Sequence, residues 1–225
     1  MRATRRVLAL ALGSAALAAS NAAAQQRSAR PNEWPKQTIR LVVPFAAGGS
    51  TDVAARILAE RLGQTLGQSV VVENRSGSAG FIGAEAVAKA PPDGYTLLMA
   101  TTGLLSIAPH LYAQMPFDPV GDFAPVSLAF ATDLVITVTG GLPVKTLQEL
   151  ISHAKAQPGK VSYASSGAGT TTHVATELFR LTAGVELLHV PYRGSGPAMN
   201  DLVAGNVQVM VDQICLLYTS DAADE

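Results

Sequence analysis

The stretch IRLVVPFAAGGSTDVAARILAERLG, residues 39–63, decides the fold class of this 225-residue chain. It opens with five residues of a short apolar run that ends at a proline, which predicts a buried strand. Two glycines then interrupt the pattern and predict a turn. From Ser50 to Gly63 apolar side chains recur at helical spacing, with Ser50 or Thr51 as the expected N-cap and Asp52 in the first turn. A strand that runs through a glycine turn into an amphipathic helix is the repeating unit of an α/β protein.

The same alternation continues to the end of the chain. Continuous apolar strands separated by helices predict parallel sheet covered on both faces, here in two α/β lobes at residues 36–132 and 133–214 that join near 130–136. A proline-rich loop leads into the apolar run 126–131. The expected strands are 39–43, 69–73, 96–100, 134–139, 161–164, 186–190 and 207–211. The expected helices are 50–63, 81–90, 101–110, 146–157, 173–183 and 197–204. For the helix 146–157, Thr146 and Glu149 form a capping box, and Leu147, Leu150, Ile151 and Ala154 form the expected buried stripe.

The N-terminal segment has the layout of an export signal. Three arginines within the first six residues precede the apolar run 7–19, and small residues at 22–24 offer a cleavage site. The apolar run is too short to span a bilayer comfortably. The segment 1–24 is therefore predicted to be a signal peptide that is cleaved near Ala24-Gln25 and directs the protein to the periplasm. Both the general and the twin-arginine export routes remain open.

The C-terminal segment CLLYTSDAADE, residues 215–225, lacks capping and periodic logic. It resembles the in-frame translation of a sequencing-library adapter, so we expect natural sequence to end near Ile214 and the fold to be incomplete at its C-terminus. Its single cysteine, Cys215, is the only one in the chain. An exported protein without other cysteines has no disulfide framework and no thiol nucleophile.

Composition excludes several classes of function. The 16 Lys and Arg residues against 17 Asp and Glu give a net charge of −1, which does not suit a nucleic-acid binder. Dinucleotide, phosphate-loop and nucleophile-elbow motifs are absent from the sequence. The four histidines do not have metal-ligand spacing. We therefore expect no cofactor, no metal and no catalytic residue.

Four loops rich in glycine and hydroxyl side chains follow expected strands, at 45–52, 101–103, 165–172 and 192–196. In open parallel sheets, ligands bind beyond the carboxyl ends of the strands, where such loops lead into helix N-termini. Backbone N–H groups and hydroxyls there can hold an anion without a cluster of lysines. Each loop could equally be an ordinary connection. His173 could touch the ligand or orient its loop, and Arg193 could clamp the ligand or pair at the surface.

With these loops, the sequence resembles the substrate-binding proteins of tripartite tricarboxylate transporters, the Bug or TctC-like family. The matching stretches occur in family order from about residue 34 to residue 214. They are Trp34-Pro35, residues 39–45 with Gly48-Gly49 and Asp52, residues 71–75, 93–98, 163–167 with Gly169 and His173, and 190–194 with Asp201-Leu202 and Gly205.

The resemblance implies a two-lobed type II periplasmic-binding-protein fold, and a monomeric receptor that closes on a small carboxylate and hands it to a membrane permease. The 45–52 and 165–170 loops would hold the carboxylate from opposite lobes, partly through water. Family chains continue past residue 214 and return to the first lobe. The candidate ligand-binding residues are Phe45, Ala46, Gly48, Gly49, Ser50, Asp52, Thr101, Ser165, Ser166, Gly167, Gly169, Thr170, His173, Tyr192 and Arg193.

Two other functions remain open at this point. An exported hydrolase could use Ser166 or Ser195 with His173, which requires the nucleophile within hydrogen-bond reach of an oriented base. A sensor subunit could present bound ligand to a membrane kinase. The identity of the ligand, a dicarboxylate, a tricarboxylate or an aromatic acid, does not follow from the sequence.

Overall fold

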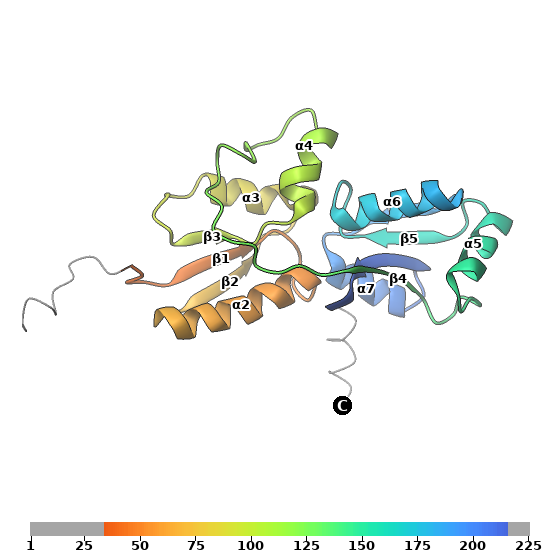
Figure 1. Ribbon diagram of the computed structural model, residues 1–225, viewed down its shortest axis with the longest axis horizontal. Helices are drawn as coiled ribbons and strands as arrows, with labels where there is room; N and C mark the ends of the chain where they lie inside the picture. The colour runs from red at the N-terminus through yellow and green to blue at the C-terminus, as the bar shows by residue number, and fades with distance from the viewer. Residues whose placement is uncertain (1–33, 216–225) are drawn as a thin grey trace, which may run out of the picture. The chain divides into compact units, whose positions relative to one another are not determined.

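The first sheet is centred on β1 (Ile39–Val43), which is buried at every position but Arg40. The computed structural model describes residues 34–215, and those from Gln37 onward belong to one compact unit that contains both sheets (Figure 1). β1 pairs in parallel with β2 (Val70–Asn74) on one side and with β3 (Thr96–Leu98) on the other. The carboxyl ends of all three strands therefore lie at one edge of the sheet.

Two helices cover the two faces of this first lobe. Leu41 and Val43 of β1 pack with Ala55 of α2 (Ser50–Leu66). On the opposite face, Leu98 packs against a cluster that contains Phe81 of α3 (Phe81–Ala88). Figure 1 shows the two helices on either side of the sheet. Shorter elements complete the lobe: η1 (Ser78–Gly80), the π-helical η2 (Gly103–Ile107) and α4 (Ala108–Leu111).

The second lobe has four strands in the order β4-β7-β5-β6. One face, which includes Ala164 and Met210, packs on α7, and the other, which includes Tyr163 and Val209, packs on α5 and α6. Neighbouring residues thus point to opposite helix layers, as the two-residue period of a strand requires. The elements are β4 (Leu134–Val138), α5 (Leu147–Ala156), β5 (Ser162–Ser165), α6 (Thr171–Ala183), β6 (Leu188–Pro191), α7 (Ser195–Val203) and β7 (Val209–Gln213).

The prediction of purely parallel sheet is wrong for one pair of strands. β4 runs antiparallel to β7, with Leu134 opposite Gln213. β4 is an edge strand next to β7, the last strand in the sequence, and no single crossover connection joins the two, so none fixes their relative direction. Residues 126–131, in that linker, are outside any strand, and Val126 and Leu128 are more than four-fifths exposed.

Local capping was predicted correctly at one helix and wrongly at another. The Thr146 hydroxyl accepts a hydrogen bond from the Glu149 amide and caps α5, but Leu147 is exposed and does not join the buried stripe. At α2, the N-cap is Gly49 rather than Ser50 or Thr51. The Ser50 hydroxyl bonds to Gln213 in the other lobe and is therefore unavailable as a cap.

The proposed signal peptide and residues 216–225 of the proposed tail lie outside the described residues. Between residues 34 and 215, none of the helices combines the length and the apolarity needed to cross a membrane. The limits of the two lobes at 36, 132 and 214 remain predictions.

Candidate functional site

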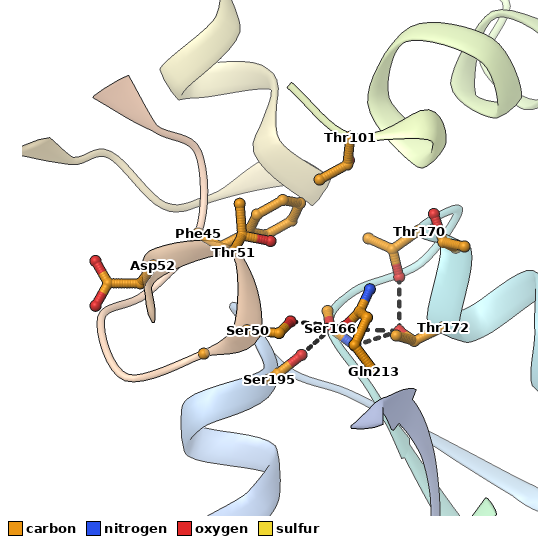
Figure 2. Close-up of a pocket in the computed structure, with 12 residues that line it drawn as sticks. Phe45, Ser50, Thr51, Asp52, Thr101, Ser166, Thr170, Thr172, Ser195 and Gln213 are labelled. Carbon is orange, nitrogen blue, oxygen red and sulfur yellow. Dashed lines mark hydrogen bonds between the residues drawn. The ribbon is translucent and has the colours of Figure 1, made fainter. Parts of the chain in front are cut away.

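One pocket lies where the two lobes meet. Its empty volume is about 370 Å³, including the part that opens to solvent. Three helices, α2, α6 and α7, begin at its wall, so that their N-terminal amides and positive dipole ends converge there. The lining residues are Phe45, Gly49, Ser50, Thr51, Asp52, Thr101, Ser166, Thr170, Thr171, Thr172, Ser195 and Gln213 (Figure 2).

Buried hydroxyl groups form a connected network in this pocket. The Ser166 hydroxyl lies 2.8 Å from that of Ser195 and accepts a bond of 3.3 Å from the Thr172 hydroxyl. Thr172 in turn lies 3.1 Å from the Thr170 hydroxyl. Ser50 of the first lobe donates to the Gln213 side-chain oxygen of the second at 2.6 Å. Figure 2 shows these groups directed toward one another. Because each hydroxyl can rotate its hydrogen, the network can reorganise to donate to a guest.

Asp52 is the one charged side chain among these lining residues, and it is already satisfied. Its carboxylate accepts bonds from the Gly48 amide at 3.0 Å, from Arg56 and from the Asn74 side chain at 2.8 Å. Burial raises the pKa of Asp52, but the hydrogen bonds from Arg56, Gly48 and Asn74 outweigh it and hold the pKa below its ordinary value. In Figure 2 the carboxylate points away from the hydroxyl network. Asp52 therefore lines the pocket, but its carboxylate is used to hold the 45–52 loop in shape.

Two histidines form hydrogen bonds to residues of the 165–172 loop. The His173 ring accepts a hydrogen bond from the Gly169 amide at its Nδ1 atom, at 3.1 Å. The Ser165 hydroxyl lies 2.7 Å from Nε2 of His189. The two rings stack on each other with centroids 4.2 Å apart, and His189 stacks on Tyr163 at 4.7 Å. His173 could touch the ligand or orient its loop, and these contacts are those of a residue that orients the loop.

Burial and proximity keep both rings neutral. Burial lowers the pKa of His189 to about 4, and the neighbouring His173 adds to that shift. Burial also lowers the pKa of His173, against a smaller opposite influence of Glu177. A proton on Nδ1 of His173 would remove the acceptor that the Gly169 amide uses.

A second, smaller hollow adjoins the first and shares Phe45 and Ser166 with it. Its empty volume is about 200 Å³, and Tyr192 and Arg193 line it together with the 77–80 turn. Four consecutive residues of that turn have positive φ, Gly77, Ser78, Ala79 and Gly80, at 135°, 47°, 54° and 99°. Arg193 thus lies beside the main pocket rather than in it.

Glycines let the two lobes touch backbone to backbone. A Cβ atom on Gly103 would lie 2.8 Å from the Thr171 nitrogen, and one on Gly196 would lie 2.6 Å from the Ala47 oxygen. The Gly103 amide donates to the Thr171 hydroxyl, and the Ala46 amide donates to the Arg193 carbonyl oxygen. At these two positions glycine therefore permits close approach of the backbone of the other lobe.

The structure brings together some of the predicted residues and not others. Phe45, Gly49, Ser50, Asp52, Thr101, Ser166 and Thr170 line the main pocket. Tyr192 and Arg193 line the adjoining hollow, whereas Ala46, Gly48, Ser165, Gly167, Gly169 and His173 support the loops from outside the pocket lining.

Five lining residues were missed. Thr51, Thr171, Thr172 and Ser195 stand within or beside the quoted loops, so the helix-start signal could have included them. Gln213 ends β7, and the parallel pairing of β7 with β5 brings it to the same edge of the sheet as the 165–172 loop.

The arrangement needed for a serine hydrolase is not formed by the predicted residues. The Ser166 hydroxyl bonds to Ser195 and Thr172, while Nδ1 of His173 is taken by the Gly169 amide. In the described part of the chain, no group of three or more potential ligands could hold a metal ion.

Comparison with known proteins gives the family. The profile described as the tripartite tricarboxylate transporter family receptor, TctC, matches residues 54–220. The chain belongs to this family. The TctC family is one of receptors and not of enzymes, and the resemblance stated from the sequence motifs is confirmed.

TctC relatives match most of this chain but extend well beyond it. A Pseudomonas protein encoded in a tcbD-tcbE intergenic region is 43% identical over 210 residues, which cover 93% of this chain and 60% of that relative. Protein BugT of Bordetella pertussis is 41% identical over 182 residues, which cover 80% and 56% respectively. The chain thus spans less than two thirds of the length of the relatives it matches.

Solved structures confirm the two-lobed type II periplasmic-binding-protein fold. An R. palustris protein solved with adipate superposes with a TM-score of 0.82 at 41% identity, over 85% of this chain and 64% of that one. MatC from Rhodopseudomonas palustris, solved with bound malate, superposes with a TM-score of 0.78 at 33% identity, over 84% of this chain and 65% of that one.

Proposed function

We propose that this chain is the ligand-binding part of an exported receptor for small organic carboxylates, which it delivers to a tripartite tricarboxylate permease. The observation that carries the proposal is the pocket itself, where neutral N–H and O–H donors from both lobes converge without a free charge of their own. Three helix N-termini at its wall favour an anionic guest. The two similar structures that hold adipate and malate support a carboxylate as that guest.

The size of the pocket favours a small ligand. Its empty volume of about 370 Å³ already includes the space that opens to solvent, so a guest enclosed between the lobes has to be compact. A dicarboxylate would place one end at the hydroxyl network and extend its other end toward the hollow that Arg193 lines. Water bridges between the guest and the hydroxyls would make the fit tolerant of related acids.

Lobe closure is part of the proposal. The contacts between Ser50 and Gln213 and between Gly103 and Thr171 form only when the lobes are together. A ligand that bridges the same elements would bind the closed form better than the open one and would shift the population toward it. Small-angle scattering should then report a smaller radius of gyration with ligand than without it.

The test of binding is titration calorimetry on the protein expressed from its full gene, with adipate, malate, citrate and benzoate, and with the diamide of adipic acid as an uncharged analogue. We expect heat from at least one acid and none from the diamide. Lack of binding by every acid would overturn the proposal.

The matched variants are Ser166→Ala and Ser152→Ala. Ser166 lies in the hydroxyl network, whereas Ser152 is exposed on α5 and bonds to the Gln148 carbonyl. A hydrogen bond to a charged ligand contributes about 1.5–3 kcal/mol, so Ser166→Ala should weaken binding by about ten-fold or more. Ser152→Ala should leave the affinity unchanged.

Export and delivery are tested separately. The mature protein should fractionate with the periplasm and begin near Gln25, which N-terminal sequencing would establish. Uptake of the bound acid into vesicles that contain the permease should require the receptor. Cytoplasmic retention of the intact chain, or uptake that is indifferent to it, would contradict this part.

A further inference from the structure

Asp212 is a buried carboxyl group that the binding site as described does not use. It lies on β7 immediately before Gln213, and only 1% of its surface is exposed. Its Oδ1 atom accepts a bond from the Gln213 amide at 2.7 Å. Its Oδ2 atom is the one buried side-chain polar atom without a hydrogen-bond partner in the part of the chain that the structure describes. A buried acceptor without a partner costs free energy, so its retention calls for a reason.

The environment of Asp212 connects it to the pocket. Burial raises the pKa of Asp212 to about 6, while Ser195, the Gln213 amide and Ser50 oppose that rise, so both serines are its neighbours. Each of these hydroxyls also has a partner in the pocket, since Ser50 donates to Gln213 and Ser195 pairs with Ser166. Figure 2 shows the Ser50 and Ser195 side chains pointing toward Ser166 and Gln213. Asp212 therefore neighbours two serines whose side chains line the ligand space.

We propose that Asp212 takes up a proton when the pocket binds a carboxylate, and that this proton turns the hydroxyls of Ser50 and Ser195 toward the ligand. The inference rests on the proposed function and adds to it a positioning residue with a measurable proton balance.

The hydrogen-bonding capacity of the two forms of Asp212 explains why its protonation and ligand binding are coupled. An ionised carboxylate only accepts, so it draws the hydrogens of neighbouring hydroxyls toward itself and leaves their lone pairs facing the pocket, which repels an anion. A protonated carboxyl can instead donate to a serine oxygen and leave the serine hydrogen free for the ligand. A second negative charge close by in a poorly hydrated site also disfavours ionisation of Asp212.

Other charged groups on the elements around β7 do not account for this behaviour. β5 contributes Tyr163, and β4 contributes no titratable side chain. α6 contributes His173, Glu177 and Arg180, of which the last two pair with each other, and α7 contributes Asp201, which accepts from Tyr192. Across the pocket, Asp52 is paired with Arg56. The pKa of Asp212 is governed by burial and by its polar neighbours Ser195, the Gln213 amide and Ser50, not by any of these charges.

The direction of the pH dependence follows from linkage. A bound anion raises the pKa of Asp212 above its value in the empty pocket, so the complex holds more protons than the free protein. Affinity should therefore fall as the pH rises above about 6, approaching a ten-fold loss per pH unit until the pKa of the complex is passed. The carboxyl groups of adipate, malate and benzoate are ionised near pH 7, so a proton taken up there with one of these acids belongs to the protein. Citrate, whose last carboxyl group titrates closer to neutrality, is left out of this measurement.

Calorimetry of the unmodified protein decides the matter without a variant. The acid that binds in the panel above is titrated near pH 7 in two buffers of different ionisation enthalpy, and the difference in heat gives the protons taken up per ligand. We expect a value approaching one. Binding without proton uptake would overturn this inference and leave the proposed function standing, whereas absence of binding would overturn both.

Variants locate the proton. Asp212→Asn should abolish the uptake and flatten the pH profile, and above about pH 7 it should bind at least as tightly as the unmodified protein. The matched control is Asp201→Asn, on α7 beside Tyr192, which should retain the uptake. Uptake that persists in Asp212→Asn would overturn the assignment. If that variant does not fold, the proton count of the unmodified protein still decides. Ligand binding that requires sodium ions and takes up no proton would also overturn the assignment.

Discussion

Gly196 of α7 lies so close to Ala47 in the opposite lobe that a Cβ atom on residue 196 would be 2.6 Å from the Ala47 carbonyl oxygen. The atom in the way is backbone, which cannot rotate aside as a side chain can. The contact couples the start of α7 to the loop that precedes α2. The two lobes can therefore come this close at the pocket because residue 196 has no side chain.

Gly196→Ala should hold the lobes apart and weaken ligand binding. Overpacking of this kind costs about 1–3 kcal/mol, and that cost falls on the closed form, so affinity should drop by about five-fold to a hundred-fold in calorimetry.

The matched control is Gly141→Ala, because a Cβ there meets nothing within 4 Å. It should bind ligand as the unmodified protein does. Equal affinity of both variants would show that the Gly196 contact does not limit closure.

Asp52→Asn should reduce stability at neutral pH and flatten its loss in acid. The folded state holds the pKa of Asp52 below the ordinary 3.8, so this carboxylate stabilises the fold above that pH. That contribution is lost as the pH falls from about 3.8 through the lower pKa of the folded state. Urea unfolding at several pH values should show that the free energy of unfolding of the unmodified protein falls in acid, and that it falls less in the variant. Asp93→Asn, at an exposed turn, is the control that should keep the acid dependence.

The stacked histidines should make the fold less stable as the pH falls below neutrality. In the unfolded chain each ring takes a proton near pH 6.5, whereas in the folded protein the pKa of His173 is lowered and that of His189 is about 4. The unfolded state therefore binds more protons between these values, and stability should decline from about pH 6.5 toward about pH 4.

His189→Gln removes one of these groups and should flatten that part of the stability curve, as measured by thermal unfolding at several pH values. His110→Gln, at the exposed end of α4, should leave the curve as it is. A curve unchanged by His189→Gln would contradict the role given to the stack.

Thr146→Ala should destabilise α5 by about 1 kcal/mol, because the Glu149 amide loses its capping acceptor. Thr146→Ser retains the hydroxyl and should recover most of the loss. Chemical unfolding of the three proteins measures the difference, and equal midpoints would show that the cap contributes nothing.

Local periodicity predicted most helices and strands because each is decided by its own residues. The run 39–43 is mostly apolar and ends at a proline, and α6 ends at Gly184 in a left-handed conformation, next to the predicted limit of the helix at residue 183. The direction of β4 could not be read in the same way. Strand direction depends on which distant strand becomes the neighbour, and an apolar pattern such as 134–138 is the same in either direction.

The site was predicted in part for a similar reason. Loop composition marked Ser166 and Thr170, which lie in the pocket. Composition could not separate residues that face the guest from those that hold the loop, such as Asp52 and His173, because that depends on which donors come from distant parts of the chain. Gln213 had no local signal, because it ends a strand and does not lie in a glycine-rich loop.

The brace that Asp52 forms with Gly48, Arg56 and Asn74 lies entirely within the first lobe. Its bonds do not involve the cargo, so the loop keeps its shape whichever molecule is carried. Serine and threonine positions facing the guest are then free to vary during evolution, or at the hands of a protein engineer, without loss of the scaffold. A library that randomises those positions and spares the brace should be a productive source of sensors for new metabolites.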